Sequence, residues 1–125
     1  MILIDDFFTI KSQHVSDGKA DFRVKLNAEH FVYRAHFPNN PITPGVCLLQ
    51  MTEELFSWLK GANFRIKTLK NVKFTAPISP LEFPEVGFLL EFTESEGLWQ
   101  IKVLIKEEET VFAKMSIVLS TNFTN

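Results

Sequence analysis

The sequence predicts an α+β domain in which an antiparallel sheet wraps around one long helix. A single helical pattern covers residues 44 to 60, and the segments after it alternate apolar and polar residues with the period of β-strands. Short turns separate the last of these segments, and such turns join antiparallel neighbours. Because 125 residues suffice for one hydrophobic core but not for two, we expect a single domain over residues 1–125.

Alternation predicts at least one strand before the helix and four after it. The first covers residues 21 to 26, and the later four are expected to form a meander, with a proline-rich bend at residues 77 to 84 and turns at 95–97 and 107–109. The residues expected on the buried face are Phe22, Val24, Leu26, Val72, Phe74, Ala76, Val86, Phe88, Leu90, Phe92, Trp99, Ile101, Val103, Ile105, Val111, Ala113, Met115, Ile117 and Leu119.

The long helix carries its own start and stop signals. Thr43 suits the N-cap, Pro44 the first helical position and Gly61 the position just past the last turn. At 100° per residue, one face is polar and the other apolar. The polar face holds Gln50, Glu53, Glu54 and Ser57, and the apolar arc holds Leu48, Leu49, Met51, Leu55, Trp58 and Leu59.

Composition excludes several classes of function. A net charge of −2 gives no positive field for nucleic acid, and no stretch approaches the length of a membrane span. The first residues lack the features of a secretory signal, so the expected location is cytoplasmic. Cys47 is the single cysteine and the three histidines are scattered, which argues against a disulfide or a metal site. We expect no metal and no other cofactor.

The most specific signal is the motif HFPNNPITPGV at residues 36 to 46, directly before the helix. It resembles the active-site motif of the β-hydroxyacyl-acyl carrier protein dehydratases, whose fold is the hotdog fold. The order of the predicted elements agrees with this resemblance over residues 20 to 120. The resemblance implies a hotdog domain acting on 3-hydroxyacyl thioesters carried by acyl carrier protein, in fatty acid or related acyl-chain biosynthesis.

The resemblance also implies roles for individual residues. His36 corresponds to the catalytic base or acid, and the backbone amide of Gly45 to the group that binds the thioester carbonyl. Phe37 and Val46 are the expected pocket neighbours. The family's second catalytic residue is an acid on the helix that reaches the site of the neighbouring subunit, and here that position holds Gln50. The expected assembly is a homodimer, a heterodimer with another hotdog subunit, or a higher oligomer.

Glutamine cannot release a proton at physiological pH, so Gln50 leaves three alternatives for the missing acid. His36 performs both proton transfers in turn, Glu53 or Glu54 substitutes from the same helix face, or a different hotdog partner supplies the carboxylate. The protein is accordingly expected to be a hydro-lyase or a non-catalytic thioester-binding subunit of a heteromeric dehydratase, with thioester hydrolysis ranked last.

Three further features have more than one interpretation. Cys47 is expected in the core rather than as a nucleophile. Tyr33 and Arg34 either border an acyl tunnel or end a strand. A locally basic segment either docks an acidic carrier protein or is the solvated face of a strand; it consists of Lys60, Arg65, Lys67, Lys70 and Lys73.

Overall fold

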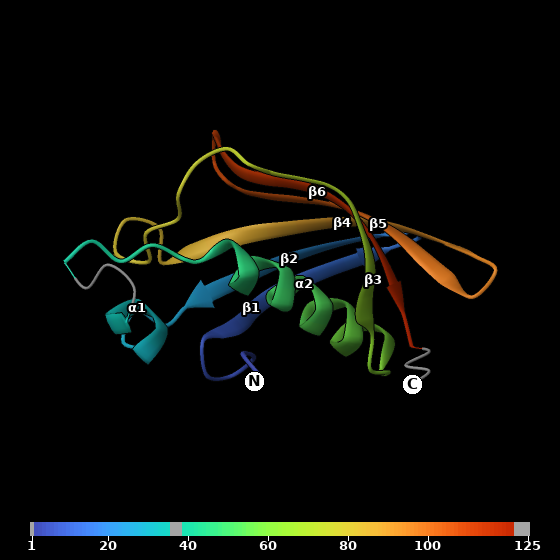
Figure 1. Cartoon of the computed structure of the whole chain (residues 1–125), viewed down its shortest axis with the longest axis horizontal. Helices are drawn as coiled ribbons and strands as arrows, with labels where there is room; N and C mark the ends of the chain where they lie inside the picture. Colours follow the sequence, from blue (N-terminus) through green and yellow to red (C-terminus); the bar gives the residue numbers. More distant parts are fainter. Residues whose placement is uncertain (1, 36–38, 122–125) are drawn as a thin grey trace.

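A computed structural model describes residues 2–35 and 39–121, which form a six-stranded antiparallel sheet with a long helix against one face (Figure 1). The elements in chain order are β1 (Phe8–Ser16), β2 (Lys19–Leu26), α1 (Phe31–Ala35), α2 (Gly45–Lys60), β3 (Arg65–Phe74), β4 (Glu85–Ser95), β5 (Leu98–Glu107) and β6 (Thr110–Ser120). The predicted antiparallel sheet around one long helix is therefore confirmed.

The strands β2, β4, β5 and β6 bury the faces that alternation predicts. Side chains pointing to opposite faces along a strand leave every second residue in the core. The predicted residues that are buried are Phe22, Val24, Leu26, Val86, Phe88, Leu90, Phe92, Ile101, Val103, Ile105, Ala113, Met115, Ile117 and Leu119. The turns at 95–97 and 107–109 are confirmed as the links between β4, β5 and β6.

The position of β3 differs from the predicted meander. The strand order is β1-β2-β4-β5-β6-β3, so β3 pairs with β6 at one edge of the sheet and not with β4. The physical reason lies in the connection to β4, which runs over residues 75–84 and is too long for a hairpin. Its first residues stay beside β6, where the amides of Thr75 and Ala76 donate to the carbonyl of Phe112.

Helix α2 ends at the predicted residue, but its buried stripe is rotated from the predicted arc. Gly61 adopts a left-handed conformation, with φ of 67°, and its amide donates to the Ser57 carbonyl. Trp58, expected in the apolar arc, is exposed, and its ring lies edge-on to the Phe22 ring with 6.1 Å between centroids. The buried helix residues are Cys47, Leu48, Met51, Thr52, Leu55 and Phe56.

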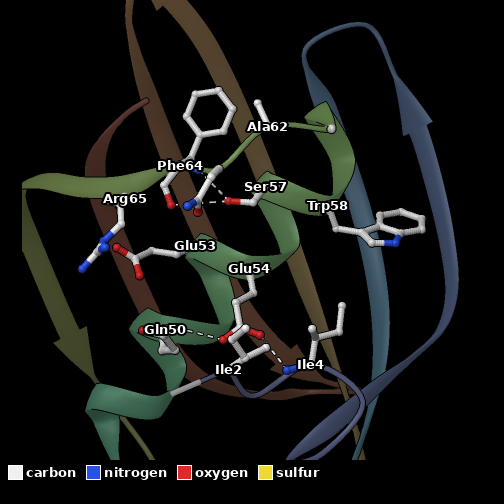
Figure 2. Close-up of a pocket in the computed structure, with 12 residues that line it drawn as sticks. Ile2, Ile4, Gln50, Glu53, Glu54, Ser57, Trp58, Ala62, Phe64 and Arg65 are labelled. Carbon is white, nitrogen blue, oxygen red and sulfur yellow. Dashed lines mark hydrogen bonds between the residues drawn. The ribbon is translucent and has the colours of Figure 1, made fainter. Parts of the chain in front are cut away.

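The N-terminal segment, residues 2–7, packs beside α2 and leads into β1, an edge strand that alternation did not predict. Leu3 and Phe7 are buried, and the Leu3 carbonyl accepts hydrogen bonds from the amides of Asp6, Phe7 and Phe8. These bonds close a tight turn and leave the backbone of this segment against the polar face of the helix (Figure 2).

Candidate functional site

The N-terminus of α2 begins one residue later than predicted. Pro44 takes the N-cap position in extended conformation, with φ of −63° and ψ of 143°, and its carbonyl accepts from the amides of Cys47 and Leu48. Proline has no side-chain acceptor that could cap the helix. The amides of Gly45 and Val46 come before the first amide that donates within the helix, so the helix itself offers them no acceptor. The first turn of α2 therefore concentrates N–H groups and the positive end of the helix dipole.

Thr43, the predicted N-cap, has a different role. Its buried hydroxyl shares a hydrogen bond of 2.8 Å with the Tyr33 hydroxyl, and its amide donates to the Ile78 carbonyl. Tyr33 lies on the short helix α1 and stacks on the Phe7 ring, so it neither ends a strand nor stands exposed. Burial raises the pKa of Tyr33. This bond holds the end of α1 against the residues that lead into α2.

The ring of Phe74 lies close to the backbone of Gly45. A Cβ added to Gly45 would lie 2.6 Å from the ring of Phe74, the last residue of β3. Beside this contact is a pocket of about 360 Å³, which we call the Gly45 pocket. It is lined by Ile42, Thr43, Gly45, Leu48, Phe74, Thr75, Ala76, Pro77 and Ile78. An apolar pocket next to the amides of a helix N-terminus is suited to an acyl chain with a polarised carbonyl.

The other predicted site residues are placed less completely. Val46 is 71% exposed and does not line the Gly45 pocket, so within this chain its side chain faces outward. His36 and Phe37 lie outside the described residues. Their catalytic and substrate-binding roles stay predictions.

Gln50 lies on the polar face of α2, as the helical period predicts, and lines a second and larger cavity (Figure 2). We call this cavity of about 660 Å³ the helix-face groove. It is lined by Ile2, Ile4, Gln50, Glu53, Glu54, Ser57, Trp58, Gly61, Ala62, Asn63, Phe64 and Arg65. Gln50 and Gly45 belong to different hollows of this chain, because Gln50 does not line the Gly45 pocket.

Both glutamates proposed as substitutes for the missing acid accept hydrogen bonds from backbone amides. Glu53 accepts from the Ile66 amide at 2.6 Å. Glu54 accepts from the amides of Leu3 and Ile4 and from the side-chain amide of Gln50. Both carboxyl groups therefore already act as hydrogen-bond acceptors within this chain. This geometry weakens the case for either residue as the acid.

Sequence reasoning missed the contribution of the N-terminal segment to this face. Leu3 and Glu54 are separated by 51 positions, and nothing in the local pattern of either residue predicts their contact. From its charge, Glu54 would be expected to pair with a basic side chain. Its partners include the backbone amides of Leu3 and Ile4, and the sequence does not mark such partners because every residue except proline has an amide N–H.

Cys47 is buried, as expected, and burial raises the pKa of its thiol. A thiol in apolar surroundings forms little of the reactive thiolate at neutral pH. His30 is also buried, with its Nδ1 accepting from the Val32 amide and its Nε2 lying 3.2 Å from Asp6. Both groups fit structural roles.

Over residues 2–35 and 39–121, no group of three or more histidine, cysteine, aspartate or glutamate side chains is arranged to hold a metal ion. The described helices include none that is both long and apolar enough to cross a membrane.

Two lysines of the basic segment have contacts within the chain. Lys70 donates to the Gln100 side chain at 2.7 Å, and the Lys60 ammonium lies 4.3 Å from the centroid of the Trp99 ring. These contacts are compatible with a solvated face, and docking of a carrier protein there stays a prediction.

Comparison with known proteins identifies the family. Residues 12–115 match the family described as ApeI-like, ApeI dehydratase. The chain belongs to the ApeI-like dehydratase family. This match includes the motif at residues 36 to 46 and all of α2, and it confirms the resemblance to hotdog dehydratases. Leu3 and Ile4, which bind Glu54, precede the matched residues.

Individual relatives agree with membership of the ApeI-like dehydratase family. A 3-hydroxyacyl-[acyl-carrier-protein] dehydratase FabZ from Protochlamydia amoebophila is 29% identical over 106 residues, which are 79% of this chain and 68% of the relative. The solved dehydratase heterocomplex ApeI:P from Xenorhabdus doucetiae contains a chain that is 19% identical, with a TM-score of 0.65 and coverage of 89% and 96%. The solved structure of an uncharacterised Erwinia carotovora protein is 19% identical, with a TM-score of 0.64, and the match covers 93% of this chain and 95% of that protein. These structures confirm the hotdog fold.

Proposed function

We propose that the chain takes part in dehydration of 3-hydroxyacyl thioesters carried by acyl carrier protein, in fatty acid or related acyl-chain biosynthesis. The observation that supports this best is the Gly45 pocket, an apolar hollow beside the first amides of α2 in a member of a dehydratase family. A cytoplasmic location is part of the same proposal.

In this reaction a base removes the proton from the carbon next to the thioester carbonyl, and the hydroxyl on the following carbon leaves as water. The electron pair of the broken C–H bond forms the new double bond, and a proton must be added to the departing hydroxyl. We assign the base to His36, because an imidazole with an ordinary pKa near 6.5 can accept a proton at neutral pH. We assign the stabilisation of the negative charge that develops on the thioester oxygen to a hydrogen bond from the Gly45 amide.

Gly45 suits this task because its lack of a Cβ leaves room for both the Phe74 ring and a substrate carbonyl. Phe37 and Val46 are proposed to contact the acyl chain or the partner subunit. Gln50 is proposed to hydrogen-bond the substrate hydroxyl, but it supplies no proton. General acid catalysis typically raises a rate by about 10²- to 10⁴-fold. If the acid comes from a partner subunit, the dehydration rate of this protein alone should be lower by a factor of that order.

The acid is proposed to come from a second hotdog subunit. Strand β3 is an edge strand of the sheet, and Leu69 in its middle is 51% exposed, so another strand can pair there. The similar Xenorhabdus chain belongs to a heterocomplex by its own description. A heterodimer in which this chain gives His36 and its partner gives a carboxylate would complete the site, and a homodimer or a higher oligomer is the alternative assembly.

The second candidate function is a non-catalytic thioester-binding or partner subunit. It is favoured by Gln50 and by the backbone hydrogen bonds that Glu53 and Glu54 accept. In this case the chain binds an acyl thioester or stabilises an active partner without turnover of its own. Hydrolysis of the thioester remains the last-ranked alternative.

Incubation of the purified protein with a 3-hydroxyacyl carrier thioester tests these functions. Mass spectrometry of the carrier-bound chain should show loss of water, either with the protein alone or with a candidate second hotdog subunit added. His36→Ala should abolish this product, whereas His14→Ala, which changes an exposed histidine of β1, should not. In a homodimer, Gln50→Glu should raise the rate.

The outcomes separate the candidates. An enoyl product that depends on His36 supports dehydration. Absence of enoyl product in every combination contradicts a catalytic role. If the activity of a partner subunit is unchanged when this chain carries His36→Ala, the non-catalytic role is favoured. Free acid without enoyl product indicates a thioesterase.

A further inference from the structure

The carboxyl group of Glu54 links the helix α2 to the N-terminal segment beside the helix-face groove (Figure 2). Its Oε2 accepts from the Gln50 side-chain amide at 2.8 Å and from the Leu3 amide at 2.8 Å. Its Oε1 accepts from the Ile4 amide at 2.6 Å and from the Leu3 amide at 3.1 Å. Both oxygens are thus occupied, by donors from the helix and from the N-terminal segment.

Neither set of donors can move away at little cost. Gln50 and Glu54 are four positions apart on α2, which places their side chains next to one another on the same face. The N-terminal segment is anchored from the other side, because Leu3 and Phe7 are buried in the core. The Glu54 carboxyl group accepts four hydrogen bonds in all, and these bonds restrict its movement.

We propose that Glu54 is a positioning residue for Gln50, and that it requires the group at position 50 to be neutral. The carboxylate fixes the direction of the Gln50 side-chain amide through one bond, while the backbone of Leu3 and Ile4 fixes the carboxylate. The N-terminal segment thereby becomes part of the support of position 50. Its importance for turnover rests on the function proposed above, but the arrangement itself can be tested without turnover.

The requirement for neutrality follows from the distance. A glutamate at position 50 would bring a second carboxylate to within hydrogen-bonding distance of Glu54, and two carboxylates that close cannot both ionise freely. Both oxygens of Glu54 already accept from the backbone amides of Leu3 and Ile4, so the introduced group would need a proton of its own to donate to Glu54 as Gln50 does. Glu53 and Arg65 are the other charged residues that line this groove. Glutamine donates to Glu54 through its neutral side-chain amide, so it needs no added proton.

The first experiment follows the side-chain amide of Gln50 by NMR in the full-length protein. In the wild type its two N–H signals should be dispersed and protected from exchange with water. Glu54→Gln should change these shifts and speed the exchange of the two N–H groups with water. Glu53→Gln is the matched control, because it removes the same charge and one backbone bond, to Ile66, but no bond to Gln50. Identical Gln50 signals in wild type and Glu54→Gln would overturn the proposal.

The second experiment measures the carboxyl pKa at position 50 by carbon-detected NMR titration. In Gln50→Glu, the introduced carboxyl should titrate about one pH unit or more above the ordinary glutamate value of about 4.3. Adding Glu54→Gln should return its pKa toward that value, whereas adding Glu53→Gln should change it much less. An ordinary value in the single variant, or one that Glu54→Gln leaves unaltered, contradicts the role of Glu54. Loss of dehydration with these titrations intact contradicts only the proposed function.

Discussion

Gly45 shows how one residue satisfies two demands at the start of α2. Its backbone opens the helix, where the amides carry partial positive charge, and its missing side chain leaves space for the Phe74 ring. The first demand concerns an electrostatic site and the second concerns packing. Because Phe74 is 52% exposed at the end of an edge strand, its ring can move, and the two demands can be separated by mutation.

Gly45→Ala should alter the site with little effect on stability. Replacing glycine by alanine where the backbone is compatible stabilises a protein by about 0.4–1 kcal/mol through the unfolded state, which offsets part of the cost of displacing the Phe74 ring. We expect a change of less than about 1 kcal/mol in the free energy of unfolding, together with a large loss of any dehydration rate. Urea unfolding and the carrier-thioester assay measure the two effects, and Gly45→Ala/Phe74→Ala tests whether space alone restores the rate. A stable variant with undiminished rate would contradict the role of this amide.

Tyr33 allows a test at a single residue, since it is the only tyrosine in the sequence. Burial raises its pKa, so the folded protein holds the phenolic proton at a pH where the unfolded chain, with a pKa near 10, releases it. The resulting stability is fully present below about pH 10 and is lost as the pH rises above that value.

The free energy of unfolding should therefore fall above about pH 10, by at most about 1.4 kcal/mol per pH unit from this group. Tyr33→Phe should flatten that part of the profile, although it lowers stability at pH 7 by about 1–3 kcal/mol because the Thr43 hydroxyl loses its partner. Denaturant unfolding at several pH values measures the profile, and tyrosinate absorbance follows the titration directly. Equal slopes for both proteins above pH 10 would show that burial of Tyr33 is not the cause.

Among the secondary-structure elements, β3 is the edge strand at which the proposed partner subunit would pair. An exposed leucine in the middle of an edge strand favours pairing with another chain, and a charge at that position opposes it. Leu69→Lys should shift the protein toward monomer without unfolding it, because the side chain is half exposed. Sedimentation velocity measures the assembly state.

The matched control is Leu81→Lys, which places the same charge on a leucine that is 70% exposed in the connection between β3 and β4. It should leave the assembly unchanged. If both variants assemble like the wild type, the β3 edge is not the interface.

The elements also show what the sequence could predict. Alternation identified β2, β4, β5 and β6 because each buries one face in the hydrophobic core, so burial leaves its period in the residue pattern. Strand β1 has only Phe8 fully buried, and its exposed face imposes no such period. The pairing of β3 with β6 depends on a connection that crosses the sheet, and alternation carries no information about strand order.

For the candidate site, the sequence predicted the start of α2 to within one residue, because proline is favoured next to a helix N-terminus. It could not predict that Phe74 would occupy the space above Gly45, since those residues are 29 positions apart and meet only through the fold. The bonds from Leu3 and Ile4 to Glu54 were unpredictable for the same reason. Local geometry is thus readable from sequence, whereas side chains brought together by topology are not.

At the scale of the whole molecule, Phe74 connects the sheet edge to the helix N-terminus. It is the last residue of β3, it pairs in register with Ala113 of β6, and its ring forms a wall of the Gly45 pocket. A strand that added to the β3 edge would restrict this residue, and an acyl chain in the pocket would contact the same ring. Under the proposed assembly, the two events are therefore linked through one side chain.

Thermodynamic linkage makes such a connection reciprocal. If partner binding orders Phe74 and thereby tightens the acyl site by some factor, an acyl chain must tighten partner binding by the same factor. A loaded substrate would then promote the assembly that completes its own site, and dilution would disassemble an empty complex before a loaded one. The packing of one phenylalanine ring on one glycine would couple catalytic readiness to subunit association.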